Sequence, residues 1–397
     1  CLFVFLYFQK YNFKGEFRMK KKIIGIGVAI ALVILLLFLT GCGNETINNN
    51  VSNNAKNEMS IAQNEQSDNT PKYATVSEYA DTRSMKGYID EQGNEITQIK
   101  YAITLDFSEG LAAVSTQGSR GGELKFGYID ANGNMVIEEK YSLAGLFSDN
   151  LASVKLDGKY GYIDKTGNTI IDFQYDRAGD FSEGLAAVCK DGKYGYIDTK
   201  GNLVVDFQYD IANPFSEGVA AVKLNGKWGF IDKQGKNIVE LKYDGASNMI
   251  NGMAQIMVIP EGSSLGKFGY INSNGEEVIK PKYSKAKNFN SGLALVQETE
   301  DSKYVYIDKQ GNEKIVLPFQ YNGAGEFSEG LAAVCKDGKF GYIDTNGNEV
   351  ITPQYDNVYA FCNGYASVEL NDKWGVIDTE GNTIIDFKYN SIGDFTN

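Results

Sequence analysis

The sequence predicts an all-β protein made of nine tandem repeats, each a three-stranded meander of 34–40 residues. The block GYID, or a close variant, recurs along the 397 residues at this spacing, and a fixed period in that range indicates a repeat architecture. The composition agrees, because 44 Gly, 25 Tyr and 22 Phe beside only 6 Pro are typical of short strands joined by tight turns. The nine blocks begin at Gly87, Gly127, Gly161, Gly195, Gly229, Gly269, Val305, Gly341 and Gly375.

The repeat at residues 181–209 shows how each element is predicted. An apolar run at Leu185–Val188 is followed by Asp191-Gly192, and an Asp-Gly pair between two such runs favours a hairpin with a primed turn. The second strand, Lys193–Asp198, ends in Asp-Thr-Lys-Gly, which fits a type I turn with Asp at its first position and Gly at its fourth. The β-branched and aromatic residues of Leu203–Tyr209 predict the third strand.

A unit of this size cannot bury its apolar face alone, so stacked neighbours must build the core. The first strand has small side chains on both of its faces, as at Ala186 and Ala187. Small side chains there would let neighbouring sheets approach closely. Nine units of unequal length favour an open, curved solenoid over residues 73–397, since propellers typically have about 4–8 blades. A closed, propeller-like ring is the alternative.

The composition argues against nucleic-acid binding and against catalysis. The net charge is −13 and the pI is near 4.7, whereas phosphate binding needs a basic face. Histidine, the commonest general base and metal ligand, is absent. None of the five cysteines forms a CxxC pair, and we interpret Cys189 and Cys335 as small buried strand residues. We therefore expect no enzyme activity, no cofactor and no metal site.

Residues 19–41 have the features of a secretory signal. Lys20–Lys22 form a positive region, Ile23–Leu39 is apolar, and the string Leu-Thr-Gly-Cys ends at Cys42. This pattern resembles the lipobox of bacterial lipoproteins, and the resemblance implies a diacylglyceryl thioether on Cys42. An uncleaved membrane anchor is the other interpretation, although the run is short for a span of ~20 residues. Both interpretations place the rest of the chain outside the cytoplasm.

The segments on either side of the signal are expected to carry no folded function. We interpret residues 1–18, which precede Met19, as leader translated upstream of the true start. Residues 42–72 follow the lipobox and are rich in Asn, Ser, Gln, Glu and Lys, which cannot fill a core. We expect this segment to be a disordered tether between lipid and folded body.

Several motifs recur in register over residues 73–397. Lys-Trp-Gly occurs at 227–229 and 373–375, other units have Lys-Tyr-Gly or Lys-Phe-Gly, and YID-x-x-GN and FSEGLAAV repeat around them. The chain thus resembles the bacterial WG-repeat (KWG-repeat) family, with departures at Val305 and Asn272 that put the turns or packing of two units in doubt. The resemblance implies a binding or scaffolding array and no single activity.

The aromatic residues that open the second strands are the candidate ligand contacts. Trp228, Trp374, Tyr160 and Tyr194 could stack on a sugar, although such a ladder more often packs between units. Turn capping explains the repeated Asp better than metal binding does, and the Glu of FSEG is expected on a solvated edge. We expect a lipid-anchored, non-catalytic adaptor for an envelope protein, or alternatively a module that binds cell-wall glycan.

Overall fold

The computed structural model describes residues 72–80, 83–117 and 124–396, which belong to one compact unit. Within these ranges the chain forms strands, turns and bends but no helix. Accordingly, none of the described segments is a helix long and apolar enough to cross a membrane. The predicted leader, the predicted signal peptide, Cys42 and all of the predicted tether except Lys72 lie outside the described residues.

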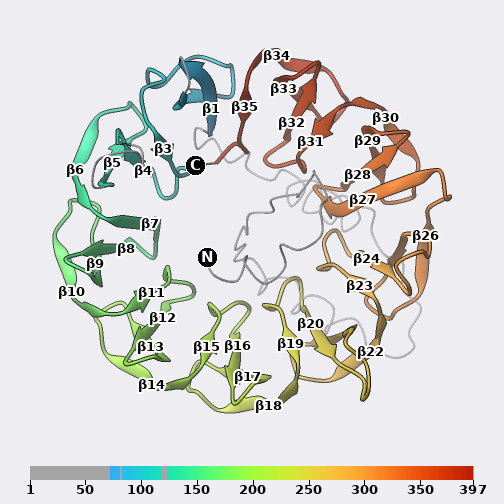
Figure 1. The fold of residues 1–397 in the computed structure, drawn as a ribbon, viewed down its shortest axis with the longest axis horizontal. Helices are drawn as coiled ribbons and strands as arrows, with labels where there is room; N and C mark the ends of the chain where they lie inside the picture. Colours follow the sequence, from blue (N-terminus) through green and yellow to red (C-terminus); the bar gives the residue numbers. More distant parts are fainter. Residues whose placement is uncertain (1–71, 81–82, 118–123, 397) are drawn as a thin grey trace, which may run out of the picture. The chain divides into compact units, whose positions relative to one another are not determined.

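The described strands form nine antiparallel sheets, which are the blades of a ring (Figure 1). Eight blades have four strands each, and these follow chain order from the centre of the ring to its rim. The innermost strands are β3 (Ile103–Thr104), β7 (Leu143–Ser148), β11 (Arg177–Ala178), β15 (Ile211–Ala212), β19 (Gly245–Ala246), β23 (Lys285–Ala286), β27 (Tyr321–Ser328) and β31 (Asn357–Val358). The second strands are β4 (Leu111–Ser115), β8 (Leu151–Leu156), β12 (Leu185–Lys190), β16 (Val219–Leu224), β20 (Met253–Val258), β24 (Ala294–Gln297), β28 (Leu331–Lys336) and β32 (Tyr365–Leu370).

The other two strands of each blade carry the GYID block and the outer edge. The third strands are β5 (Phe126–Asp130), β9 (Lys159–Ile163), β13 (Lys193–Asp198), β17 (Lys227–Asp232), β21 (Lys267–Asn272), β25 (Val305–Ile307), β29 (Lys339–Asp344) and β33 (Lys373–Asp378). The outer strands are β6 (Met135–Tyr141), β10 (Thr169–Tyr175), β14 (Leu203–Tyr209), β18 (Asn237–Tyr243), β22 (Glu277–Tyr283), β26 (Glu313–Val316), β30 (Glu349–Tyr355) and β34 (Thr383–Tyr389).

The ninth blade joins the two ends of the array and closes the ring. Its inner strand, β35 (Ser391–Ile392), pairs with β1 (Tyr73–Ala80), which pairs in turn with β2 (Arg83–Asp90). Tyr73 and Thr396 exchange backbone hydrogen bonds of 2.7 and 2.8 Å. The closed ring that the sequence left as the alternative is therefore the observed architecture, and the open solenoid is not. The physical reason is that β35 pairs with β1, whose edge an open stack would leave exposed.

Each four-stranded blade contains one strand more than the sequence predicted. The predicted three strands are present, but a further inner strand such as Arg177–Ala178 precedes them. A two-residue strand has no alternating pattern by which a sequence could reveal it. The turn predictions are confirmed: Asp191 and Gly192 have φ of 52° and 79°, as a type I′ turn requires, and Gly201 donates to the Asp198 carbonyl at 2.9 Å.

The core lies between neighbouring blades and repeats around the ring. The fully buried Tyr196 of the GYID block packs on Phe215 of the next blade, with ring centroids 4.7 Å apart. Its hydroxyl donates to the Asn213 carbonyl of that blade at 2.6 Å. Burial raises the pKa of this tyrosine above its ordinary value. Equivalent Tyr–Phe pairs join Tyr88 to Phe107, Tyr128 to Phe147, Tyr162 to Phe181, Tyr270 to Phe289, Tyr306 to Phe327 and Tyr342 to Phe361.

Candidate functional site

Because the strands of a blade are antiparallel, their connections alternate between the two faces of the ring. The hairpins from second to third strand, and the crossovers to the next blade, form what we call the hairpin face. The loops from first to second strand and the turns from third to fourth form the turn face. Three insertions are recognised in the sequence, at Ser77–Met85, Ser115–Lys125 and Ile259–Lys267, and their described residues lie in hairpins of the hairpin face. Insertions on one face are typical of a binding face.

On the turn face, side chains of one blade form hydrogen bonds with the backbone of the next blade. The Glu183 carboxylate accepts hydrogen bonds from the Glu217 and Gly218 amides of the next blade, at 2.5 and 3.0 Å. In the same way, the Glu329 carboxylate accepts hydrogen bonds at 2.6 and 2.8 Å from two amides in the corresponding loop of the blade that follows it. Glu109, Glu217 and Glu329 are exposed, as expected for a solvated edge, but the glutamates of this edge also bind the positive-φ amides that the next blade presents. Sequence alone could not show that contact, since the two partners lie 34 residues apart.

The repeated aspartates cap turns, as predicted. Asp198 Oδ1 accepts from the Lys200 and Asn202 amides at 2.9 and 2.8 Å, and Oδ2 accepts from Asn202 Nδ2 at 2.9 Å. The bond from the Asn202 side chain is the main cause that lowers the pKa of this carboxyl below its ordinary value. In the described part of the chain, no group of three or more acidic or cysteine side chains could hold a metal ion.

The four candidate aromatic residues open the third strands of different blades, so the structure does not gather them into one site. Tyr160, Tyr194 and Trp228 are partly buried, and Trp374 is 9% exposed. Each packs against the apolar cluster between its own blade and the next. Trp374 also stacks on Tyr359, with ring centroids 5.0 Å apart. These positions therefore help to join blades.

Lysines cover the rings of two of these candidates. The Lys223 ammonium lies 5.9 Å from the centroid of the Trp228 ring, and that of Lys155 lies 5.3 Å from the centroid of Tyr160. A cation in this position is attracted to the ring face on which a sugar would stack. A sugar that stacked on the same face of either ring would compete with the lysine for it.

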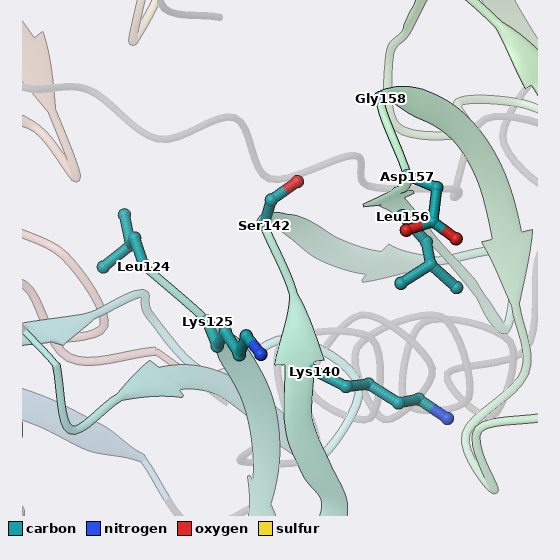
Figure 2. Close-up of a pocket in the computed structure, with 7 residues that line it drawn as sticks. All are labelled: Leu124, Lys125, Lys140, Ser142, Leu156, Asp157 and Gly158. Atoms are coloured by element: carbon teal, nitrogen blue, oxygen red, sulfur yellow. The ribbon is translucent and has the colours of Figure 1, made fainter. Parts of the chain in front are cut away.

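Two hollows on the hairpin face were not predicted from the sequence. One has a volume of about 190 Å³ and lies between the blade of β3–β6 and the blade of β7–β10 (Figure 2). It is lined by Leu124, Lys125, Lys140, Ser142, Leu156, Asp157 and Gly158. The other, of about 270 Å³, lies beside the blade of β23–β26 and is lined by Tyr283, Val296, Glu298, Ser302, Lys303, Val305, Glu313, Val316 and Phe319.

The second hollow follows from the departure at Val305. A Cβ on the equivalent Gly195 would lie 2.5 Å from the Val205 carbonyl oxygen, because the outer strand crosses closely over that glycine. At Val305 this approach is blocked, and β25 pairs with a four-residue β26 through Val305 and Val316. The segment after β26 then carries Phe319, which is 73% exposed. The Asn272 departure leaves its turn intact, since Asn272 Oδ1 still accepts two amides at 3.0 Å.

Comparisons with known proteins agree with this architecture. The family model described as WG containing repeat matches residues 87–118, 126–160, 160–194, 194–228, 228–258, 268–304, 306–340, 340–374 and 374–397. No curated protein matches the chain. Among solved structures, the crystal structure of the eukaryotic initiation factor is 12% identical, with 82% of this chain and 98% of that chain covered and a TM-score of 0.57.

Other solved structures are less similar. A dihydro-heme d1 dehydrogenase is 12% identical, with 82% of this chain and 75% of that chain covered and a TM-score of 0.44. Virginiamycin B lyase from Staphylococcus aureus is 15% identical, with 52% and 81% covered and a TM-score of 0.31. At 12% identity, the likeness to the initiation factor concerns the fold alone.

Proposed function

This chain belongs to the WG containing repeat family, and we propose that it is a lipid-anchored, extracytoplasmic scaffold that binds a protein partner through the hairpin face. The contrast between the two faces carries the proposal. On the turn face, the loop glutamates and turn aspartates bind neighbouring backbone. The hairpin face has similar contacts, such as Asp176 with the Asp191 amide, but it also holds the lengthened hairpins, both hollows, and the exposed Leu265 and Phe319. Varied loops on a rigid repeat scaffold are typical of binding proteins.

The proposed location rests on the sequence before the ring. The positive, apolar and lipobox segments lead to Cys42, and the polar residues up to Lys72 would give the ring reach from the membrane surface. The proposed absence of catalysis rests on the lack of histidine and of a nucleophile motif.

A crosslinking experiment with the full chain tests the choice of face. A photo-crosslinking amino acid is placed at Ser264, in the lengthened hairpin, or at Lys200, in a turn of the opposite face; both positions are exposed. We expect one discrete protein adduct from the envelope at Ser264 and none at Lys200. Equal adducts at both positions, or none at Ser264, would contradict the proposal.

Cell-wall glycan is the second candidate ligand, because three candidate aromatic residues are only partly buried. Binding of the full chain to purified sacculi, compared between the parent and Trp228→Ala, tests it. Retention that this substitution abolishes, with an unchanged circular dichroism spectrum, would favour glycan over protein. We expect no retention, since Lys223 covers the ring. Trp374→Ala is a poorer probe because Trp374 is buried.

A further inference from the structure

At several interfaces between blades, an aromatic ring of one outer strand packs on the last tyrosine of the preceding outer strand. Phe207 of β14, which precedes Gln-Tyr in the sequence, lies 6.5 Å from Tyr175 of β10, measured between ring centroids. An outer phenylalanine in this place therefore helps to join one blade to the next. The same contact joins Tyr141 to Phe173, at 6.5 Å, and Tyr355 to Phe387, at 6.3 Å.

The corresponding ring is displaced at the blade of β23–β26. Phe319 also precedes Gln-Tyr, but five residues separate Ile315 from Tyr321, whereas three occupy this place in the next blade. The Tyr321 amide donates to the Pro318 carbonyl at 3.0 Å, and the turn that this bond closes contains Phe319. Phe319 is consequently 73% exposed, whereas Phe207 is partly buried.

The second hollow lies beside this displaced ring. It is lined by Phe319 and by Tyr283, the last residue of β22, whose equivalents pack together at the interfaces just described. Val296, Val305 and Val316 add to its apolar wall, and all of its lining residues lie within the described range 124–396. Tyr283 and Val296 are buried, whereas Val316 is 46% exposed. The hollow therefore lies against a tyrosine on which a phenylalanine packs elsewhere in the ring.

Carboxylates outnumber ammonium groups at this hollow. Among its lining residues, Lys303 alone carries a positive charge, and its ammonium lies 4.9 Å from the centroid of the Phe319 ring. Two carboxylates line the hollow and two more lie in the hairpin between β24 and β25: Glu298, Glu313, Glu300 and Asp301. All four are exposed, and none takes part in the ion pairs between described residues. This surface favours a partner with positive charge next to an apolar group.

We propose that this hollow, which we call the Phe319 pocket, binds an aromatic side chain of the protein partner that has basic residues on either side of it. The ring would pack against Tyr283 and Val316, as Phe207 packs against the preceding blade at its own interface. The basic side chains would lie near Glu298 and Glu313. The inference rests on the protein partner proposed above and names what the hairpin face recognises. Aromatic anchors seated in pockets supply much of the binding energy of protein interfaces.

The lysine beside Tyr283 does not exclude an aromatic ring from the pocket. The Lys282 ammonium lies 4.8 Å from the centroid of the Tyr283 ring. At an equivalent place, the Lys140 ammonium lies 5.1 Å from the centroid of the Tyr141 ring, and Phe173 packs on that tyrosine as well. A lysine and an aromatic ring therefore share one tyrosine elsewhere in the molecule.

A second copy of this chain fits the pocket less well than a basic partner does. The exposed Phe319 of one copy would supply a ring to the other, but the carboxylates of both copies would then approach each other. The net charge of −13 adds to this repulsion. A segment with basic residues beside its aromatic ring is attracted instead.

Ligand-observed fluorine NMR with the full chain tests the proposal, because line broadening detects weak binding. The probe is a blocked Gly-Lys-Phe-Lys-Gly peptide whose ring is para-fluorinated, compared with Gly-Glu-Phe-Glu-Gly carrying the same ring. We expect saturable broadening of the lysine peptide and several-fold weaker binding of the glutamate peptide. Unlabelled Gly-Lys-Phe-Lys-Gly should compete at about tenfold lower concentration than Gly-Lys-Ala-Lys-Gly, since only the former buries a ring.

Variants show whether the peptide occupies this pocket. Val316→Trp should fill it and abolish the broadening, whereas Val350→Trp, at an exposed position of outer strand β30, should leave the broadening unchanged. The double variant Glu298→Gln and Glu313→Gln should bind the lysine peptide several-fold more weakly and with less dependence on salt. Unchanged circular dichroism spectra would confirm that these variants fold.

Four results would overturn the proposal: no broadening of the lysine peptide at millimolar concentration, equal competition by the alanine peptide, equal binding of the glutamate peptide, or binding that persists in Val316→Trp. Self-association of the full chain that Phe319→Ala abolishes would make a second copy the occupant instead. Failure of the crosslinking experiment at Ser264, with intact binding of the lysine peptide, would count against the protein partner and leave the preference of the pocket standing.

Discussion

Ring closure can be tested by a disulfide between the two ends of the array. Ser77 and Ser391 are directly opposed in the pairing of β1 with β35, and their hydroxyl oxygens lie 2.6 Å apart. Opposed residues of antiparallel strands have Cα separations within the range that a disulfide spans. The double substitution Ser77→Cys and Ser391→Cys should therefore form an intramolecular disulfide on mild oxidation. In an open solenoid these two residues would lie at opposite ends.

The expected stabilisation follows from the length of the closed loop. The two residues are 314 positions apart, and chain entropy then gives an upper value of about 6 kcal/mol at 25 °C. Engineered disulfides deliver less, so we expect the free energy of unfolding to rise by about 2–4 kcal/mol. The reduced double variant should be about 1 kcal/mol less stable than the parent, because it loses the hydrogen bond between the hydroxyls.

Thiol counting and urea denaturation provide the measurements. After oxidation, the unfolded double variant should bind as many maleimide groups as the parent, whereas each single cysteine variant should bind one more. The urea midpoint is then compared with and without reductant. Two additional reactive thiols, or disulfide-linked dimers in place of the intramolecular bond, would refute the closed ring.

Three further predictions concern the contacts between blades. Tyr196→Phe should lower the free energy of unfolding by about 1 kcal/mol in urea titrations, because the part-buried Asn213 carbonyl of the next blade loses its donor. Tyr194→Phe, in the same strand, should change it by less than about 0.5 kcal/mol, since no hydrogen bond of its hydroxyl is described. Glu183→Ala should speed amide exchange at Gly218, measured by mass spectrometry, because that amide loses its acceptor. Burial raises the pKa of Glu326 to about 7 from an ordinary 4.5. Between these two pKa values the folded state retains a proton that the unfolded state has released. The free energy of unfolding, followed by urea midpoints, should therefore fall by up to about 3 kcal/mol as pH rises from about 4.5 to 7. Glu326→Gln should remove this dependence on pH.

Each of these predictions has a result that would contradict it. Equal losses for Tyr196→Phe and Tyr194→Phe would remove the role assigned to the buried hydroxyl. Unchanged exchange at Gly218 would show that Glu183 does not hold the next blade. A slope with pH that persists in Glu326→Gln would assign that titration to another group.

The elements that the sequence predicted correctly depend on neighbouring residues. The Asp191-Gly192 hairpin and the capped turn at Asp198 were predicted because turn chemistry is local. The number of repeats followed from their period. The two-residue inner strand Arg177–Ala178 was missed because its pairing with β12 shows in no local pattern.

The candidate site was predicted less well than the fold. The aromatic ladder was visible in the sequence, and its alternative interpretation as packing between units agrees with where Tyr160, Tyr194, Trp228 and Trp374 lie. The hollow lined by Ser142 was not predicted, because its walls come from two different blades.

By itself, then, the sequence of this protein determined an all-β array of nine repeats, with its hairpins and turns, because each of these follows from residues close together in the chain. Tertiary structure alone decided that the array closes, that Glu183 binds the next blade, and that a hollow opens at Ser142. These features depend on contacts between different blades, and the closing contact joins residues 314 positions apart. No local pattern in a sequence specifies the geometry with which such distant segments meet.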